Sequence, residues 1–96
     1  TMFVVFLKFG PNKANAGKLM DGHKAWIQQG FDDGVFLVVG SLKPEAGGGI
    51  VAYNTTMEEL ERRVNLDPFV AEKVVTAEIW EIDPARSDAR LDFLAA

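Results

Sequence analysis

FVVFLKFGP, residues 3–11, is the stretch that decides the fold. Its β-branched and aromatic side chains end at Gly10-Pro11, a pair that terminates regular structure, so the pattern predicts a strand. Successive side chains of a strand point to opposite faces. Both faces of this strand are apolar, with Phe3, Val5, Leu7 and Phe9 on one and Val4 and Phe6 on the other. The strand therefore needs cover from two sides.

The next segment, residues 15–33, has the periodicity of a helix. Apolar residues and the single histidine recur there at steps of three and four, as on the buried stripe of a helix. These residues are Leu19, Met20, His23, Trp26, Ile27 and Phe31. Gly30 and Gly34 offer places for the helix to end.

Two further strands and a glycine-rich connection follow this helix. Residues 35–42 form a second apolar run, residues 50–53 a third, and residues 43–49, with three consecutive glycines, read as the loop of a hairpin. Such a triplet can also cradle an anion, but it would then lead into a helix rather than a strand. The hairpin, bordering a cleft, is the interpretation we adopt.

The second half of the chain predicts two short helices and a final strand. Thr56 with Glu59 three residues later matches a capping box, which starts a helix over residues 57–64. Asp67 caps a further helical turn that begins at Pro68 and runs to about residue 73. Residues 74–82 form the last strand, stopped by Asp83-Pro84.

The resulting order, β-α-β-β-α-β, is the ferredoxin-like arrangement of an α+β protein, with an antiparallel four-stranded sheet and both helices on one face. We expect one domain over residues 2–84 and a C-terminal tail over residues 85–96. Five or six large side chains left in water on the second face would cost about 10 kcal/mol. A second copy packed sheet to sheet removes this cost, so we expect a homodimer.

Composition excludes several classes of partner and site. The 96 residues carry a net charge of -4 with no basic cluster, which argues against nucleic acid. No apolar run approaches the roughly 18 to 20 residues that span a bilayer, so we expect no membrane contact and a cytoplasmic protein. The absence of cysteine excludes disulfides and thiolate metal sites.

His23 is the one side chain whose ordinary chemistry allows proton exchange near neutral pH. A carboxylate that accepts a hydrogen bond from one ring nitrogen would fix the tautomer of the imidazole and leave the other nitrogen free to take or give a proton. In the alternative reading, His23 is a partly buried helix residue and Asp67 only a cap. Asp21 or Asp32-Asp33 beside one histidine form no recognised metal-ligand set, so we expect no metal.

These features together resemble the YciI-like (YCII-related) family. The likeness covers about residues 2–82 and depends on His23, the run 34–41 (GVFLVVGS), the glycine-containing hairpin and Asp67-Pro68-Phe69. The resemblance implies a dimeric α+β barrel with a His/Asp pair at a cleft, which corresponds to His23 and Asp67. The chain has Met20 where the family often has arginine, and Gly40-Ser41 where it often has Gly-Pro.

The sequence thus leads to a YciI-like small-molecule enzyme of lyase or isomerase type, without a cofactor. His23 would be the general acid or base, Asp67 its orienting partner, and Ser41 a hydrogen-bond donor to substrate, although serine at a strand end also forms turns. Two alternatives stay open. One is a noncatalytic ligand-binding or scaffold homodimer; the other is a small monooxygenase or haem-handling protein in which His23 is an axial ligand.

Overall fold

The computed structural model describes residues 1–95 and has the predicted order of elements. The strands are β1 (Met2–Phe9), β2 (Phe36–Leu42), β3 (Gly47–Ala52) and β4 (Val75–Ile82). The helices are α1 (Ala16–Asp32), α2 (Met57–Asn65) and α3 (Pro68–Ala71). Two 3-10 segments, η1 (Lys13–Asn15) and η2 (Ala89–Ala95), precede α1 and follow β4.

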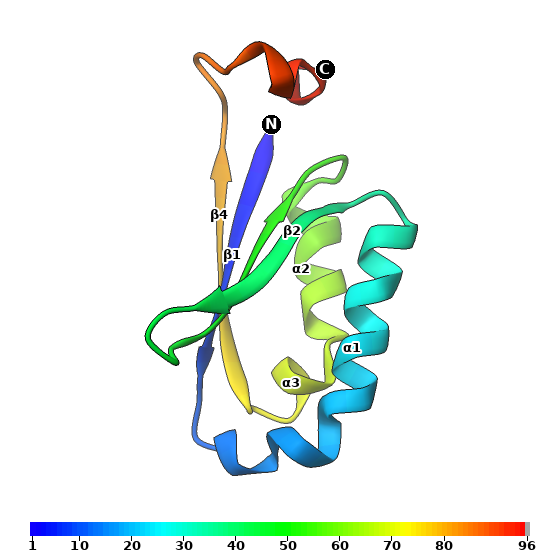
Figure 1. The fold of residues 1–96 in the computed structure, drawn as a ribbon. Helices are drawn as coiled ribbons and strands as arrows, with labels where there is room; N and C mark the ends of the chain where they lie inside the picture. Colours follow the sequence, from blue (N-terminus) through cyan, green and yellow to red (C-terminus); the bar gives the residue numbers. More distant parts are fainter. Residues whose placement is uncertain (96) are drawn as a thin grey trace.

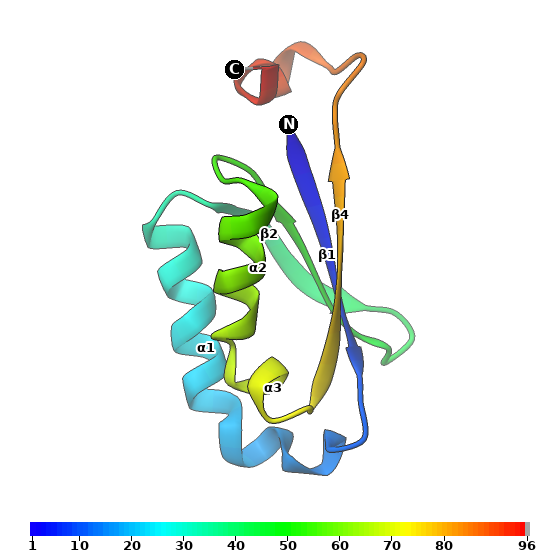
Figure 2. The same ribbon diagram turned by 180° about the vertical axis from the view of Figure 1, so that it is seen from behind.

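The four strands form one sheet in the order β2-β3-β1-β4, and each neighbouring pair is antiparallel. α1, α2 and α3 all lie on one side of this sheet, as Figures 1 and 2 show from opposite directions. The predicted α+β class with a ferredoxin-like βαββαβ order is therefore confirmed.

Alternation along β1 divides the sheet into a core face and an outer face. Phe3, Val5 and Leu7 are 1%, 0% and 3% exposed and pack with Leu60 and Val64 of α2 in the core. The side chains between them lie on the outer face and are only partly buried. β1 is thus covered completely on one side, as its sequence pattern requires.

Phe9 is more exposed than the other members of its face. It lines the same cavity as Leu7, but its side chain is 38% exposed because it lies at the end of β1, where the Lys13 ammonium sits 4.4 Å from its ring centroid.

The predicted glycine loop over residues 43–49 is wrong at its second half. Gly47, Gly48 and Gly49 belong to β3 and pair with both β1 and β2, so the connection is limited to residues 43–46. Gly47 has a φ of 128°, which favours glycine, and a Cβ there would overlap the Leu7 carbonyl oxygen. These glycines form a strand because their main chains pair with two neighbouring strands, which the composition of the segment does not reveal.

Two predicted caps start the short helices. The Thr56 hydroxyl accepts a hydrogen bond from the Glu59 amide at 3.2 Å, which confirms the cap of α2. Asp67 caps α3 by accepting from the Phe69 amide at 3.0 Å. α3 ends at Ala71, two residues before the predicted end.

The segment that was predicted as a tail contacts the domain. Leu94 is 3% exposed, and its carbonyl accepts a hydrogen bond from the Thr1 amino group at 3.0 Å. The Phe93 ring meets the Tyr53 ring edge to face, with centroids 5.3 Å apart. η2 therefore lies at the N-terminal end of β1 (Figure 1). The last residue of the predicted tail, Ala96, lies outside the described residues.

The outer face of the sheet is apolar but less exposed than the sequence implied. Val38, Val51, Val4 and Trp80 form one row across the four strands. Val38 and Trp80 at its ends are 59% and 58% exposed, whereas Val4 and Val51 between them are half-buried by their neighbours. The cost of leaving this face in water is therefore smaller than an estimate that treats every side chain as exposed.

Among the helices of residues 1–95, none combines the length and apolar character that crossing a bilayer requires.

Candidate functional site

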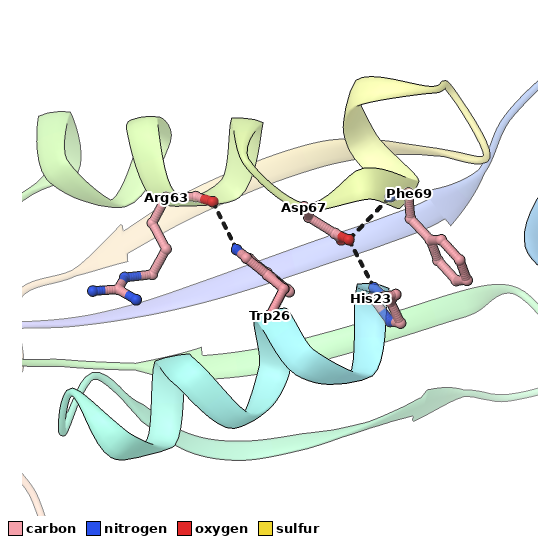
Figure 3. A network of polar contacts seen from close by, with 5 residues as sticks. All are labelled: His23, Trp26, Arg63, Asp67 and Phe69. Atoms are coloured by element: carbon pink, nitrogen blue, oxygen red, sulfur yellow. Dashed lines mark hydrogen bonds and ion pairs between the residues drawn. The ribbon is translucent and has the colours of Figure 1, made fainter. Parts of the chain in front are cut away.

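His23 and Asp67, separated by 44 residues in sequence, meet where α1 packs against α3. His23 lies on the face of α1 that points toward α3, and Asp67 occupies the N-cap of α3. His23 Nδ1 lies 2.8 Å from Asp67 Oδ1, and the same oxygen accepts the Phe69 amide (Figure 3). The cap that starts α3 thus also presents its carboxylate to the histidine.

Asp67 is completely buried, which makes its contact with His23 important. Its Oδ2 has no hydrogen-bond partner among the described residues. A buried carboxylate is costly unless donors compensate it, so His23 and the Phe69 amide provide most of this compensation. A carboxylate can only accept; His23 Nδ1 therefore carries hydrogen, and Nε2 is left for proton exchange.

Aromatic packing fixes the plane of the His23 ring. The Phe69 ring stacks on it with a centroid distance of 3.9 Å and an interplanar angle of 3°. Trp26, one turn further along α1, stacks more loosely at 6.0 Å, and its indole Nε1 donates to the Arg63 carbonyl at 2.9 Å. Figure 3 shows His23 and Trp26 of α1, with Asp67 and Phe69 at the start of α3 and the main-chain carbonyl of Arg63 from α2 as their partners. The imidazole is therefore held by packing as well as by its hydrogen bond.

A cavity of about 330 Å³ opens beside His23, between α1 and the ends of β1, β2 and β3. Its lining is mostly apolar, with Phe69, Met20 and Ile27 among the contributors. His23, Lys24 and Ser41 are its polar and charged side chains. Ligand sites commonly combine an apolar wall with a few convergent polar groups, so this cavity is the candidate site.

All three residues singled out from the sequence are close to this cavity. His23 and Ser41 line it, and Asp67 lies behind His23, in contact with the ring. The structure therefore brings them together, while their catalytic roles stay predictions.

Sequence reasoning missed three other residues of the site. Phe69 was noticed only within the Asp-Pro-Phe triplet, although its position two residues after the capping Asp67 brings its ring beside His23. Lys24 lines the cavity, but in the sequence it is one of several basic residues that form no cluster. Gly48 was assigned to a loop, and only the strand register places it on the cavity wall.

No group of three or more histidine, aspartate and glutamate side chains within residues 1–95 is arranged to hold a metal ion.

Comparison with solved structures places this fold beside a known enzyme. The structure is similar to that of 5-chloro-2-hydroxyhydroquinone dehydrochlorinase (TftG) from Burkholderia phenoliruptrix AC1100, in complex with 2,5-dihydroxybenzoquinone. The TM-score is 0.72 and the sequence identity 15%, over 86% of this chain and 94% of that chain. The likeness is one of fold. It agrees with the ferredoxin-like α+β fold that the sequence predicts. No protein-family model matches the chain, and no curated protein sequence matches it.

Proposed function

We propose that the protein is a small-molecule enzyme of lyase or isomerase type in which His23 transfers a proton and no cofactor takes part. The 2.8 Å contact between His23 Nδ1 and Asp67 Oδ1, beside a cavity that the same imidazole lines, carries this proposal. Asp67 is the positioning residue, because it touches the ring rather than the cavity. Ser41 would donate a hydrogen bond to the bound molecule.

The arrangement supports one kind of reaction in particular. His23 Nε2 would accept a proton from an acidic C–H or O–H of the substrate, and the electron pair of that bond would move into the substrate's π-system. In an elimination, a leaving group then departs with its own electron pair. In an isomerisation, the imidazolium returns the proton at another atom. The structurally similar dehydrochlorinase acts on a hydroxyhydroquinone, which is consistent with the first of these reactions.

The decisive experiment compares the wild-type protein with His23→Asn on a panel of single-ring hydroxylated compounds, beginning with 5-chloro-2-hydroxyhydroquinone. Positioned acid-base groups contribute about 10²–10⁴-fold to rate, so we expect kcat to fall by that factor in the variant. Full activity of His23→Asn would exclude this residue as the proton-transfer group. Unchanged circular dichroism would show that the variant still folds.

Asp67→Asn separates positioning from catalysis. The amide keeps the size of the side chain but removes its negative charge, so its oxygen accepts more weakly from His23 Nδ1 and holds the imidazolium less well than the carboxylate does. We expect kcat to fall with little change in KM. The preference for hydrogen on Nδ1, measured by ¹⁵N NMR of labelled histidine, should weaken with it.

We also propose that the chain is YciI-like and pairs as a homodimer through the outer face of its sheet. The apolar row from Val38 to Trp80 supports this pairing, and a second copy would present the same row.

The same experiments separate the two alternatives. A protein that binds members of the panel and converts none of them would favour the noncatalytic ligand-binding or scaffold homodimer. A Soret band after haem addition that disappears in His23→Asn would favour a haem-handling protein with His23 as ligand.

A further inference from the structure

One wall of the cavity contains two small residues side by side in the sheet, Ser41 and Gly48. Gly48 of β3 is directly paired with Ser41 of β2 and with Leu7 of β1, so the three share one face of the sheet. Leu7 is 3% exposed within the core, which identifies this as the helix-facing side. Since Gly48 lies between the other two, the sheet is hollowed at the point where a side chain would otherwise stand.

The backbone does not require glycine at position 48. Its φ lies outside the left-handed region, unlike that of Gly47, and a Cβ built on it would meet only the Gly40 carbonyl oxygen, at an ordinary 3.5 Å. The neighbouring row on the same face carries Val39 and Ile50, which fill the space above them. The missing side chain of Gly48 therefore provides room for a ligand.

The size of the hollow limits what it can hold. Its volume is about 330 Å³, near the lower end of the roughly 300–1,000 Å³ typical of ligand pockets. A cavity of about 150 Å³ holds a benzene ring. One ring with several substituents therefore fits.

The charge of the lining is opposite to that of the chain. Lys24 lines the cavity and has no ion-pair partner within residues 1–95, and none of the described lining residues is a carboxylate. Lys13 lies over Phe9, another lining residue. Asp67 is buried behind His23. Glu45 lies in an adjoining pocket that shares Phe9, Ser41 and Gly47 with the cavity, and that pocket also contains Lys13 and Lys43. In a chain of net charge -4, this rim favours a ligand with a negative charge.

We infer, on the basis of the function proposed above, that the cavity binds a single-ring planar molecule carrying an acidic oxygen. The ring lies against Gly48, and the acidic oxygen lies toward Lys24. Gly48 is then the residue that determines the size of ligand accepted, and Lys24 the residue that selects its charge.

The test measures binding alone, by titration of the ¹⁵N-labelled protein. The probes are benzoate and 2,5-dihydroxybenzoquinone as acidic rings and hydroquinone as a ring that is neutral at pH 7. We expect the acidic probes to bind more tightly than hydroquinone. Gly48→Val should lower the affinity for both acidic probes at least tenfold, and Gly48→Ala should lower it less. Lys24→Met should lower the affinity for the acidic probes at least threefold at low salt, and added salt should reduce this effect.

Two matched variants control for general effects. Gly17→Ala replaces a glycine with nothing within 4 Å, and Lys18→Met removes a charge from the same helix at a position that does not line the cavity. Both should bind as the wild type does. Thermal unfolding of Gly48→Val should match the wild type; if that variant unfolds, Gly48→Ala carries the test.

Three results would overturn this assignment of the ligand. They are failure of the wild type to bind either acidic probe, equal affinity for hydroquinone, and unchanged binding by the folded position-48 variants. Probe binding and turnover are measured separately on the wild type: selective binding of the acidic probes with no turnover of any compound in the panel would remove the proposed function and leave this assignment of the ligand standing.

Discussion

The contact between His23 and Asp67 shows how one side chain can serve both folding and chemistry. Asp67 starts α3, compensates for its own burial through the Phe69 amide, and holds the histidine with the same oxygen. A cap needs only a short polar side chain, but this cap is completely buried and faces a titratable ring. The two interpretations that the sequence left open, cap and catalytic partner, are therefore compatible at this residue.

His23→Ala should destabilise the protein because it leaves a buried carboxylate with one donor fewer. Removing one partner of a buried pair typically costs about 3–5 kcal/mol. The double variant His23→Ala/Asp67→Asn should be more stable than His23→Ala alone, since the amide is neutral and still accepts the Phe69 amide. Urea unfolding of the wild type, the two single variants His23→Ala and Asp67→Asn, and the double variant gives the coupling free energy.

Equal stability of His23→Ala and the double variant would mean that Asp67 carries no uncompensated charge when His23 is absent.

At the level of elements, local sequence rules succeeded where a helix end was marked by its own residues. Thr56 and Asp67 cap α2 and α3 as predicted, because a cap is a contact between neighbours in the chain. The same rules failed at Gly47–Gly49, where pairing with two distant strands decides the structure. Burial of Trp26 against Arg63 likewise depends on a helix 37 residues away.

Gly30→Ala tests the close approach of α1 to the sheet. A Cβ at this position would overlap the Phe36 ring, so the helix must shift or Phe36 must leave its rotamer. Overpacking of this kind typically costs about 1–3 kcal/mol, more than alanine gains in helix propensity. A lower midpoint of thermal unfolding is expected. Gly17→Ala on the same helix has open space and should not lower the midpoint.

The end of α1 is tied to α2 by Asp33, which gives a pH dependence. The Gln29 side-chain amide donates to Asp33 Oδ1 at 2.7 Å, and the Arg63 guanidinium lies 2.9 Å from Oδ2. These two hydrogen bonds lower the pKa of Asp33 below its usual 3.8. Because the folded pKa is the lower one, the stabilisation is present above pH 3.8 and is lost as the pH falls through the folded value.

Asp33→Asn should therefore be slightly less stable than the wild type at pH 7, with the difference disappearing as the pH falls through the lowered pKa of Asp33. The carboxylate is exposed, so the effect is small and should weaken in salt. Urea unfolding at a series of pH values measures it. A difference that stays constant from pH 7 to pH 2.5 would contradict this account.

At the scale of the whole molecule, the outer face of the sheet is the apolar surface that the subunit itself does not cover. Helices protect one side of the sheet, and Val38 and Trp80 remain more than half exposed on the other. Because Val4 and Val51 are partly buried by their neighbours, a second copy would remove less apolar surface from water than the sequence pattern suggests, but it would still bury Val38 and Trp80. The homodimer proposal therefore depends on fewer side chains than the sequence pattern indicated.

Trp80→Glu should convert the proposed dimer to a monomer, because sheet-to-sheet packing would bury an unpaired carboxylate. Sedimentation velocity at several protein concentrations measures the change. Leu66→Glu is the matched control, since Leu66 is 75% exposed at the end of α2, away from the outer face, and should leave the assembly unchanged. A monomeric wild type at tens of micromolar would remove the proposal.

The sequence by itself determined the order of helices and strands, the alternation of β1 and the caps of α2 and α3, because these depend on periodicity and on neighbours in the chain. It also named His23 and Asp67, the second through resemblance to a family. Only the tertiary structure decided that their side chains touch, that Phe69 stacks on the imidazole, and that Gly48 hollows the cavity beside them. Those contacts join residues far apart in the chain, and strand register and helix packing fix them.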